Sequence, residues 1–347
     1  MKVIPIPPSL EEKSFDPIVQ AMGGAEGARV LFDARQLRWV DPYGMLGLLA
    51  AAEVAGRDGE RPVLQLPKSA DVLSYLGRMR FFEHAEALFE LHGAPRRGRG
   101  GESSSDVLLE ITPIRSYQDV HSVVDRVNER AIEILTHQLH YPVREAWQFG
   151  SMLSEVCQNI LEHAQATGWV ATQTYSRIPQ LDRRVVKIGV VDLGIGFKGS
   201  LAGAHAARYG ERWGDAAALE AAFIHGLTRF HDPGRGQGLK QIRKQVGRWG
   251  GKVSIRSGTA RIADVPAWDD ASPMEERLAF FPGAQIGIVL PAREPVPAGG
   301  AAGGAAGGAR QGGAAARPAG GGRSGARRGG GRGGGAGPAA GRGSGPS

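Results

Sequence analysis

Two glycine-rich segments interrupt the apolar patterning of this 347-residue chain and limit which parts of it can fold. The second of them, from Pro297 to the C-terminus, is almost wholly Gly and Ala, with seven arginines and no acidic residue. Such a composition cannot bury enough apolar surface to offset the entropy lost on ordering it. We therefore expect residues 294–347 to form a disordered Gly/Ala/Arg-rich tail.

The first glycine-rich segment, "GAPRRGRGGESSSD" at residues 93–106, lies between two stretches that each have a regular apolar pattern. This composition is typical of an interdomain linker. A chain of this length has room for two domains. The sequence thus predicts one domain at residues 1–92 and a second at residues 107–293.

The formal net charge of +7 comes from the tail, because the basic side chains before it equal the 35 acidic ones in number. Arg-Gly segments such as "ARRGGGRGGG" hold RNA loosely through charge, so we expect nucleic acid to bind only weakly, through the tail. No run of about 18 apolar residues occurs and the N-terminus has no leader pattern, so we expect a cytoplasmic protein that does not enter a membrane. The single cysteine, Cys157, is expected to be a small buried apolar residue.

Both predicted domains have an α/β pattern. In the first, apolar runs predict a strand at residues 30–32, a helix that ends near Gly56 and a strand in "PVLQLP". In the second, they predict a strand at residues 107–111 and helices at residues 117–139 and 144–166. Four further strands are predicted in "WVATQTYS", "RVVKIGVVD", "KVSIRSG" and "AQIGIVLP".

Three motifs in the second domain carry candidate chemistry. Glu155, Asn159 and His163 are spaced four apart and so share one face of the predicted helix, although a solvated polar face has the same pattern. In "VVDLGIGF", Asp192 ends an apolar strand and is followed by Gly194 and Gly196. A carboxylate beside a hollow made by glycines can accept a hydrogen bond from the amine of adenine, although an ordinary Asp-Gly turn also fits.

The third motif, "DPGRGQGLKQIRKQV", places glycines directly before a predicted helix that starts near Leu239. Free backbone amides and the helix dipole favour an anion at such a position, and the alternative is a flexible loop. It does not match the G-x-x-x-x-G-K-[ST] phosphate loop. The candidate phosphate-binding residues are Gly234, Arg235, Gly236, Gly238 and Lys240.

Together and in this order, the three motifs resemble the three boxes of the GHKL ATPase family and its Bergerat fold, over residues 107–291. The resemblance implies a two-layer α/β sandwich with a mixed sheet, and ATP held between the helices and a mobile lid at residues 197–233. It implies that Asn159 binds Mg²⁺, that His163 belongs to the nucleotide site, that Asp192 reads the adenine amine and that Glu155 is the catalytic carboxylate.

The chain departs from the family at the last box, where a Gly-Thr pair is replaced by Gly283-Ala284. The lost hydroxyl would weaken nucleotide affinity by about 1 kcal/mol, the value of one ordinary hydrogen bond. Ala284 is still expected beside the nucleotide.

Within that family, the form of the first box is closest to the anti-sigma-factor serine kinases, which phosphorylate a STAS-type partner. No phosphoacceptor histidine motif precedes residue 107. Kinases of this kind often dimerise, so a homodimer is left open.

The first domain resembles a STAS domain, more loosely, over residues 15–92. Its turn reads Asp41-Pro42-Tyr43-Gly44 where phosphorylatable domains have Asp-Ser-Ser-Gly, so no hydroxyl of Ser or Thr is available. We expect a docking or regulatory domain, with an ordinary structural α/β unit as the alternative.

The sequence therefore predicts a Mg·ATP-binding regulatory protein, a serine/threonine kinase of the anti-sigma-factor type that acts in trans on a STAS-type or sigma-factor-like protein. The alternative is a nucleotide-gated switch with little or no turnover. A third hypothesis, RNA binding through the tail, predicts that the main activity depends on residues 297–347.

Overall fold

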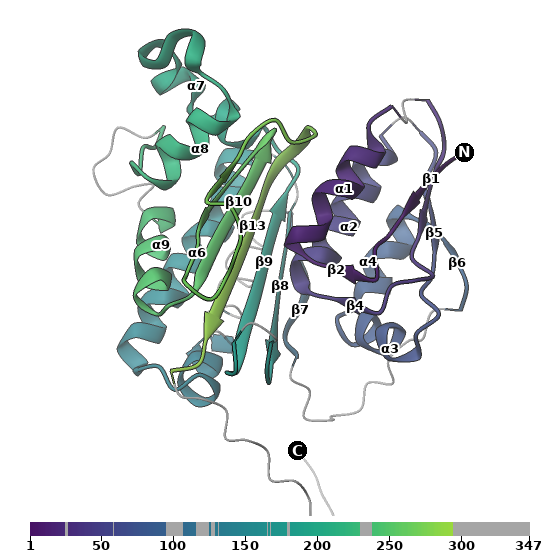
Figure 1. Cartoon of the computed structure of the whole chain (residues 1–347), viewed down its shortest axis with the longest axis horizontal. Helices are drawn as coiled ribbons and strands as arrows, with labels where there is room; N and C mark the ends of the chain where they lie inside the picture. Colours follow the sequence, from purple (N-terminus) through teal and green to yellow (C-terminus); the bar gives the residue numbers. More distant parts are fainter. Residues whose placement is uncertain are drawn as a thin grey trace, which may run out of the picture. The chain divides into compact units, whose positions relative to one another are not determined.

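The computed structural model shows a mixed α/β chain, in which residues 1–299 form one compact unit (Figure 1). It describes residues 1–24, 27–57, 59–94, 107–115, 125, 129–130, 132–164, 166, 168–178, 181–229 and 238–293, with only the backbone at 107–108, 152 and 160–164. Most of the predicted linker and the whole predicted tail lie outside these ranges. The proposed division at residues 93–106 therefore stays a prediction.

The N-terminal part, residues 1–92, contains a four-stranded parallel sheet in the order β1-β3-β5-β6. Parallel neighbours need crossover connections, and helices supply them here. Two short strands, β2 and β4, also pair in parallel. The elements are β1 (Lys2–Pro5), β2 (Ser9–Leu10), α1 (Glu12–Met22), β3 (Val30–Asp33), β4 (Trp39–Val40), α2 (Pro42–Ala55), β5 (Val63–Gln65), α3 (Ala70–Arg78), α4 (Phe81–Leu88) and β6 (Glu90–His92).

Helix α2 is buried along most of its length and packs against other elements of the chain on several sides. It starts at Asp41, whose Oδ1 accepts a hydrogen bond from the backbone N of Gly44 at 2.9 Å, and Pro42 fits the first helical position. At Gly44, a Cβ would lie 2.3 Å from the carbonyl oxygen of Leu10. Only glycine therefore allows this close approach.

The C-terminal part, residues 107–293, contains a seven-stranded sheet in the order β12-β11-β10-β13-β9-β8-β7. The prediction located β8, β9, β10 and β13 and missed β11 and β12. The strands are β7 (Val107–Ile114), β8 (Gly168–Tyr175), β9 (Val185–Asp192), β10 (Lys252–Gly258), β11 (Ala260–Asp264), β12 (Met274–Glu275) and β13 (Phe281–Pro291).

The expectation of a mixed sheet is corrected, because every pair of neighbouring strands described in this sheet is antiparallel. Strands β9 and β10 run in the same direction and are joined by a helical connection, as a parallel pair would be. The last strand, β13, inserts between them and pairs with both. β9 and β10 are therefore parallel to each other but are not neighbours in the sheet.

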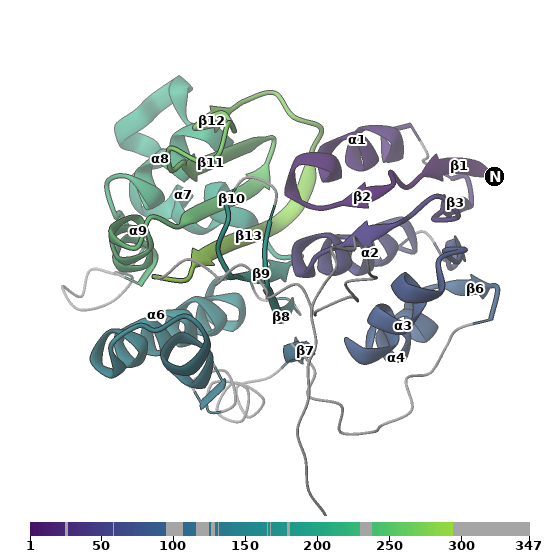
Figure 2. The ribbon, with the colours of Figure 1, turned by 60° about the horizontal axis from the view of Figure 1, so that its bottom comes forward.

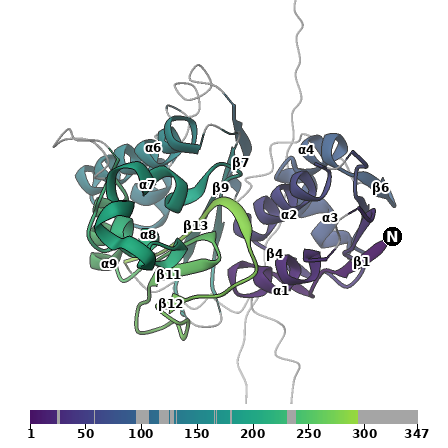
Figure 3. The same ribbon diagram turned by 90° about the horizontal axis from the view of Figure 1, so that it is seen from above.

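Helices cover one face of the seven-stranded sheet, as the turned view and the view from above show (Figure 2, Figure 3). Most of the predicted helix at residues 117–139 lies outside the described residues, except near its end, where a π-helical turn occurs. The helical elements are η1 (Ile134–Gln138), α6 (Val143–Ala164), α7 (Gly196–Tyr209), the 3₁₀ turn η2 (Gly210–Arg212), α8 (Asp215–Phe223) and α9 (Gly238–Arg248).

Both faces of this sheet are buried along its central strands. On β9, Ile188 and Val190 belong to the core under the helices, while the next residue, Val191, belongs to a core shared with residues 1–92. Helix α2 lies against β9, and a Cβ at Gly189 would come within 3.0 Å of the backbone N of Tyr43. Burial on both faces explains why these strands read as continuous apolar runs.

Among the described residues, no helix combines the length and the apolar character that crossing a bilayer requires.

Candidate functional site

A cavity lies between the helices and the seven-stranded sheet, near the end of β9 and the start of β13. The empty space within it measures about 820 Å³ when the open solvent at its mouth is included. Four residues named from the sequence line it: Asn159, Asp192, Gly196 and Ala284. The other lining residues are Val156, Val190, Phe197, Ser200, Leu201, Ala222, Leu227, Thr228, Arg229, Leu239 and Ile286.

Helix α6 carries the first motif. Its neighbours Val156 and Cys157 are buried in the core, which leaves Glu155 and Asn159 half-buried. Asn159 lines the cavity. Glu155, one turn earlier, lies outside the lining, and its Oε1 accepts a hydrogen bond from the backbone N of Gly238 at 2.9 Å. His163 lies on α6, but its side chain falls outside the described residues.

Asp192 is the last residue of β9 and lies where three strands meet, paired with Gly168 on β8 and with Ala284 on β13. Its Oδ1 accepts hydrogen bonds from the backbone N of Gly194 at 2.9 Å and of Ala284 at 3.3 Å. Burial disfavours the charged carboxylate and raises the pKa of Asp192 to about 6, against the two hydrogen bonds, which lower it. The group is thus a desolvated acceptor at the cavity.

Gly196 begins α7 with a φ of +64°, a region that L side chains rarely adopt. A Cβ there would lie 2.6 Å from Oγ of Ser257. That hydroxyl accepts a hydrogen bond from the backbone N of Phe197 at 3.2 Å and donates one to the carbonyl of Gly283 at 2.7 Å. Ser257 therefore joins the start of α7 to the start of β13, a role that no sequence motif indicates.

Gly283 has a φ of +76°, and a Cβ on it would lie 2.0 Å from the carbonyl oxygen of Asp192. No side chain can be accommodated there. The backbone of Ala284 meets Asp192 directly, so the alanine at the last box keeps the backbone contact although it lacks the hydroxyl.

The third motif is described only in part, because Gly234, Arg235 and Gly236 lie outside the described residues. Gly238 is the first residue of α9, and a Cβ on it would lie 2.5 Å from the carboxyl carbon of Glu155. The carboxylate of Glu155 thus accepts the hydrogen bond of the first amide of α9, a position where a phosphate was expected from the sequence. Lys240 lies in the first turn of α9, outside the described cavity lining, and its chain passes close to Gly226.

Several residues of the cavity have no signal in the sequence. Phe197 and Ser200 come from α7, and Thr228 and Arg229 from the loop after α8, all within the segment expected to be the lid. The carbonyl of Thr228 lies 2.8 Å from Nε2 of His205, so this loop is tied to α7. None of these residues was singled out as a site residue from the sequence.

The donor set limits which metal can bind. In the described part of the chain, no group of three or more His, Cys, Asp or Glu side chains could hold a metal ion. An amide oxygen from Asn159 supplies one ligand at most. Mg²⁺ fits such a place, because it keeps several waters and takes further ligands from substrate phosphates.

No family model matches the chain, and neither a curated protein nor a solved structure matches it.

Proposed function

We propose that residues 107–293 form a Bergerat-type, two-layer module of the GHKL kind that binds Mg·ATP in the cavity described above. In this proposal the protein is a regulatory serine/threonine kinase, which transfers the γ-phosphate to a partner protein in trans. The N-terminal part, with its parallel sheet and crossover helices, is a STAS-like docking or regulatory domain.

The observation that carries the proposal is the convergence of three distant stretches of chain on one cavity. Asn159 comes from α6, Asp192 and Gly196 from the end of β9 and the turn after it, and Ala284 from β13. An amide, a desolvated carboxylate and glycine turns are the groups that a purine nucleotide with a divalent cation requires. Polar residues that lie on separate elements by chance would not be expected to line the same cavity.

Each residue then has a defined role. Asp192 accepts a hydrogen bond from the exocyclic amine of adenine, and the apolar residues Val156, Leu201 and Ile286 pack against the base. Asn159 holds Mg²⁺, which supplies positive charge to the phosphates. Phosphoryl transfer rests mainly on positioning and on charge stabilisation, so few groups need to react covalently.

Glu155 is the proposed general base, and it has to exchange its present partner for the acceptor hydroxyl. Its Oε1 now accepts from the first amide of α9. Because helix N-termini favour anions, a phosphate arriving at α9 competes with the carboxylate for that amide. Release of Glu155 by the nucleotide would direct the base towards the partner's serine or threonine.

The N-terminal part supports a role in docking rather than as a phosphoacceptor. Tyr43, in the turn where phosphorylatable STAS domains carry a serine, is buried, and its hydroxyl donates a hydrogen bond to Oε1 of Gln285 at 3.1 Å. The hydroxyl of Tyr43 therefore faces β13 and is not accessible to accept a phosphate. This supports the proposal that the substrate is a separate protein.

One observation favours the second candidate, a nucleotide-gated switch without turnover. The carboxylate of Glu155 already accepts a hydrogen bond from the first amide of α9, and the nucleotide would then mainly exchange this contact for one with its phosphate. The two functions differ in the effect of Glu155→Ala on signalling.

The test of the proposed function uses γ-labelled Mg·ATP with the full-length protein and a cell extract. We expect a labelled partner protein with the wild type, no label with Asn159→Ala, and no label with Glu155→Ala, which still binds ATP. If Glu155→Ala abolishes labelling but leaves signalling by the partner intact, the switch is the correct function. If Asn159→Ala labels the same partner as the wild type, the nucleotide site is wrongly assigned.

A further inference from the structure

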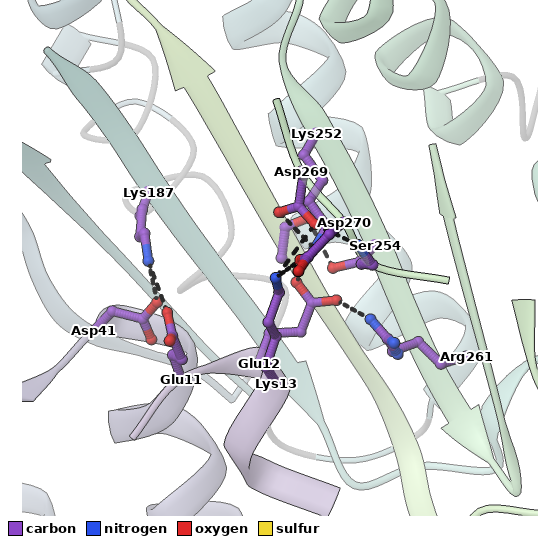
Figure 4. Close-up of polar contacts among 12 residues, drawn as sticks. Glu11, Glu12, Lys13, Asp41, Lys187, Lys252, Ser254, Arg261, Asp269 and Asp270 are labelled. Carbon is purple, nitrogen blue, oxygen red and sulfur yellow. Dashed lines mark hydrogen bonds and ion pairs between the residues drawn. The ribbon is translucent and has the colours of Figure 1, made fainter. Parts of the chain in front are cut away.

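The face of the seven-stranded sheet opposite the helices carries basic side chains that meet carboxylates of the N-terminal part (Figure 4). Three strands supply four of these cations, and the start of α1 and the turn before α2 supply the acids. The cations are Lys187 on β9, Lys252 and Arg256 on β10, and Arg261 on β11. The carboxylates are Glu11, Glu12, Asp16 and Asp41.

All four cations are largely buried within this contact. Nζ of Lys187 lies 3.0 Å from Asp41 and 3.3 Å from Glu11, and the lysine side chain is 13% exposed. Nε of Arg256 lies 2.6 Å from Asp16, and the arginine side chain is 1% exposed. An unpaired charge at such a depth is costly, so these pairs hold residues 1–92 in one position against the sheet.

The remaining contacts extend the same surface. Glu12 lies 3.2 Å from Lys252 and 2.5 Å from Arg261, and the rings of Phe15 and Phe281 meet edge to face at 5.5 Å. The surface thus combines charge pairs with apolar packing, which fixes its register.

Neighbouring residues on these strands alternately take part in this contact and line or support the cavity. On β10, Arg256 binds Asp16, while the next residue, Ser257, holds Gly283 and Phe197. Successive side chains of a strand point to opposite faces, so a shift of the strand moves both groups together.

The same alternation occurs on β9 and β13, two strands that line the cavity. On β13, Gln285 accepts the hydrogen bond of Tyr43, while Ala284 lines the cavity and binds Asp192. On β9, Val191 packs into the core shared with the N-terminal part, and Asp192 follows it. All three strands therefore connect the two sites at adjacent positions.

We propose that docking of the N-terminal part on this sheet face is thermodynamically coupled to nucleotide binding in the cavity, an inference that rests on the proposed function. The docked N-terminal part holds β9, β10 and β13 in the arrangement that places Asp192 and Ala284 at the cavity and keeps Ser257 hydrogen-bonded to Gly283 and Phe197. A nucleotide bound there tightens the docking in return, because coupling between two sites is reciprocal. A partner that displaces residues 1–92 from the sheet releases the nucleotide.

The first test weakens the docking without touching the cavity. Asp16→Ala removes the partner of Arg256, and Glu83→Ala is the matched control, because Glu83 pairs with Arg80 on the surface of the same part of the chain. By calorimetry with Mg·ATP on the full chain, we expect the Kd to rise at least about fivefold for Asp16→Ala, the lower end of usual coupling. The control is expected to stay within about twofold. Equal Kd values for a folded Asp16→Ala protein and the wild type would overturn the coupling.

The second test needs no variant and covers the case in which Asp16→Ala does not fold. Hydrogen exchange of the wild type is followed with and without a non-hydrolysable Mg·ATP analogue. We expect slower exchange both in β9 at the cavity and in α1 and α2. Slower exchange at the cavity alone overturns the coupling, whereas no binding and no change anywhere overturns the proposed function and the coupling with it.

Discussion

Replacing Asp192 with asparagine should stabilise the folded protein while weakening nucleotide binding. The carboxylate is desolvated, and its pKa is raised from 3.8 to about 6. A raised pKa means that folding favours the protonated form, so this stabilising contribution is complete below pH 3.8 and is lost as the pH rises through about 6. Asparagine has almost the same shape, and its Oδ1 can still accept from the amides of Gly194 and Ala284.

The size of the effect follows from the shift. Roughly two pKa units at about 1.36 kcal/mol each correspond to about 3 kcal/mol, the expected gain in the free energy of unfolding of Asp192→Asn over wild type at pH 7.5. At pH 5 the gain should fall to about half of that, because the wild-type carboxyl is then mostly protonated in the folded state. The loss of a charge-assisted hydrogen bond to adenine should weaken Mg·ATP binding about tenfold.

The assay is urea unfolding of both proteins without nucleotide, at several pH values between 5 and 8, followed by calorimetry with Mg·ATP at pH 7.5. Comparing the two proteins at each pH cancels the titration of all other groups. A variant that is less stable at pH 7.5, or a difference that does not change with pH, would refute the assignment of Asp192 as a desolvated carboxylate.

Three further predictions concern single positions. Gly283→Ala should lower the free energy of unfolding by about 2–5 kcal/mol, measured by urea unfolding, because its Cβ would overlap the carbonyl of Asp192 at a positive φ; a loss below about 1 kcal/mol would contradict this. Glu155→Ala should cost about 1 kcal/mol of stability by uncapping the amide of Gly238 and should slow phosphotransfer at least about 100-fold without weakening ATP binding, because the carboxylate no longer competes with the phosphate; unchanged phosphotransfer would remove it as base. Burial raises the pKa of the Cys157 thiol to about 12, so iodoacetamide should alkylate it only in urea, and rapid labelling of the native protein would show that the helix core is open.

The central strands and the first two motifs could be predicted because each has a local signal. The runs around Val190 and Ile286 are apolar on both faces, and the spacing of Glu155 and Asn159 follows the helical period. Strand β12 was missed because it is a two-residue strand at the sheet edge, and β11 because Arg261 and Asp264 interrupt its short apolar pattern.

The contact between the two parts of the chain could not be predicted from either part alone. Lys187 and Arg256 lie inside predicted strands, where a charged residue indicates an exposed face, but both are buried against carboxylates far away in the sequence. The hydrogen bond between Glu155 and Gly238 was missed for the same reason, because the two residues are far apart along the chain. From the sequence, the amide of Gly238 was expected to bind a phosphate. The local apolar pattern predicts the helices and strands. Which polar side chains form hydrogen bonds or ion pairs with each other depends on contacts between residues far apart along the chain.

The most direct measurement of the central claim is titration calorimetry of the full-length protein with ATP, with and without Mg²⁺, for the wild type and Asn159→Ala. We expect one binding event per chain that depends on Mg²⁺ and is weakened at least about tenfold in the variant. The Mg²⁺-free affinity for the adenine end should change little between the two proteins. No Mg²⁺-dependent uptake by the wild type, or the same uptake by both proteins, would contradict the claim that Asn159 and Asp192 grip one nucleotide.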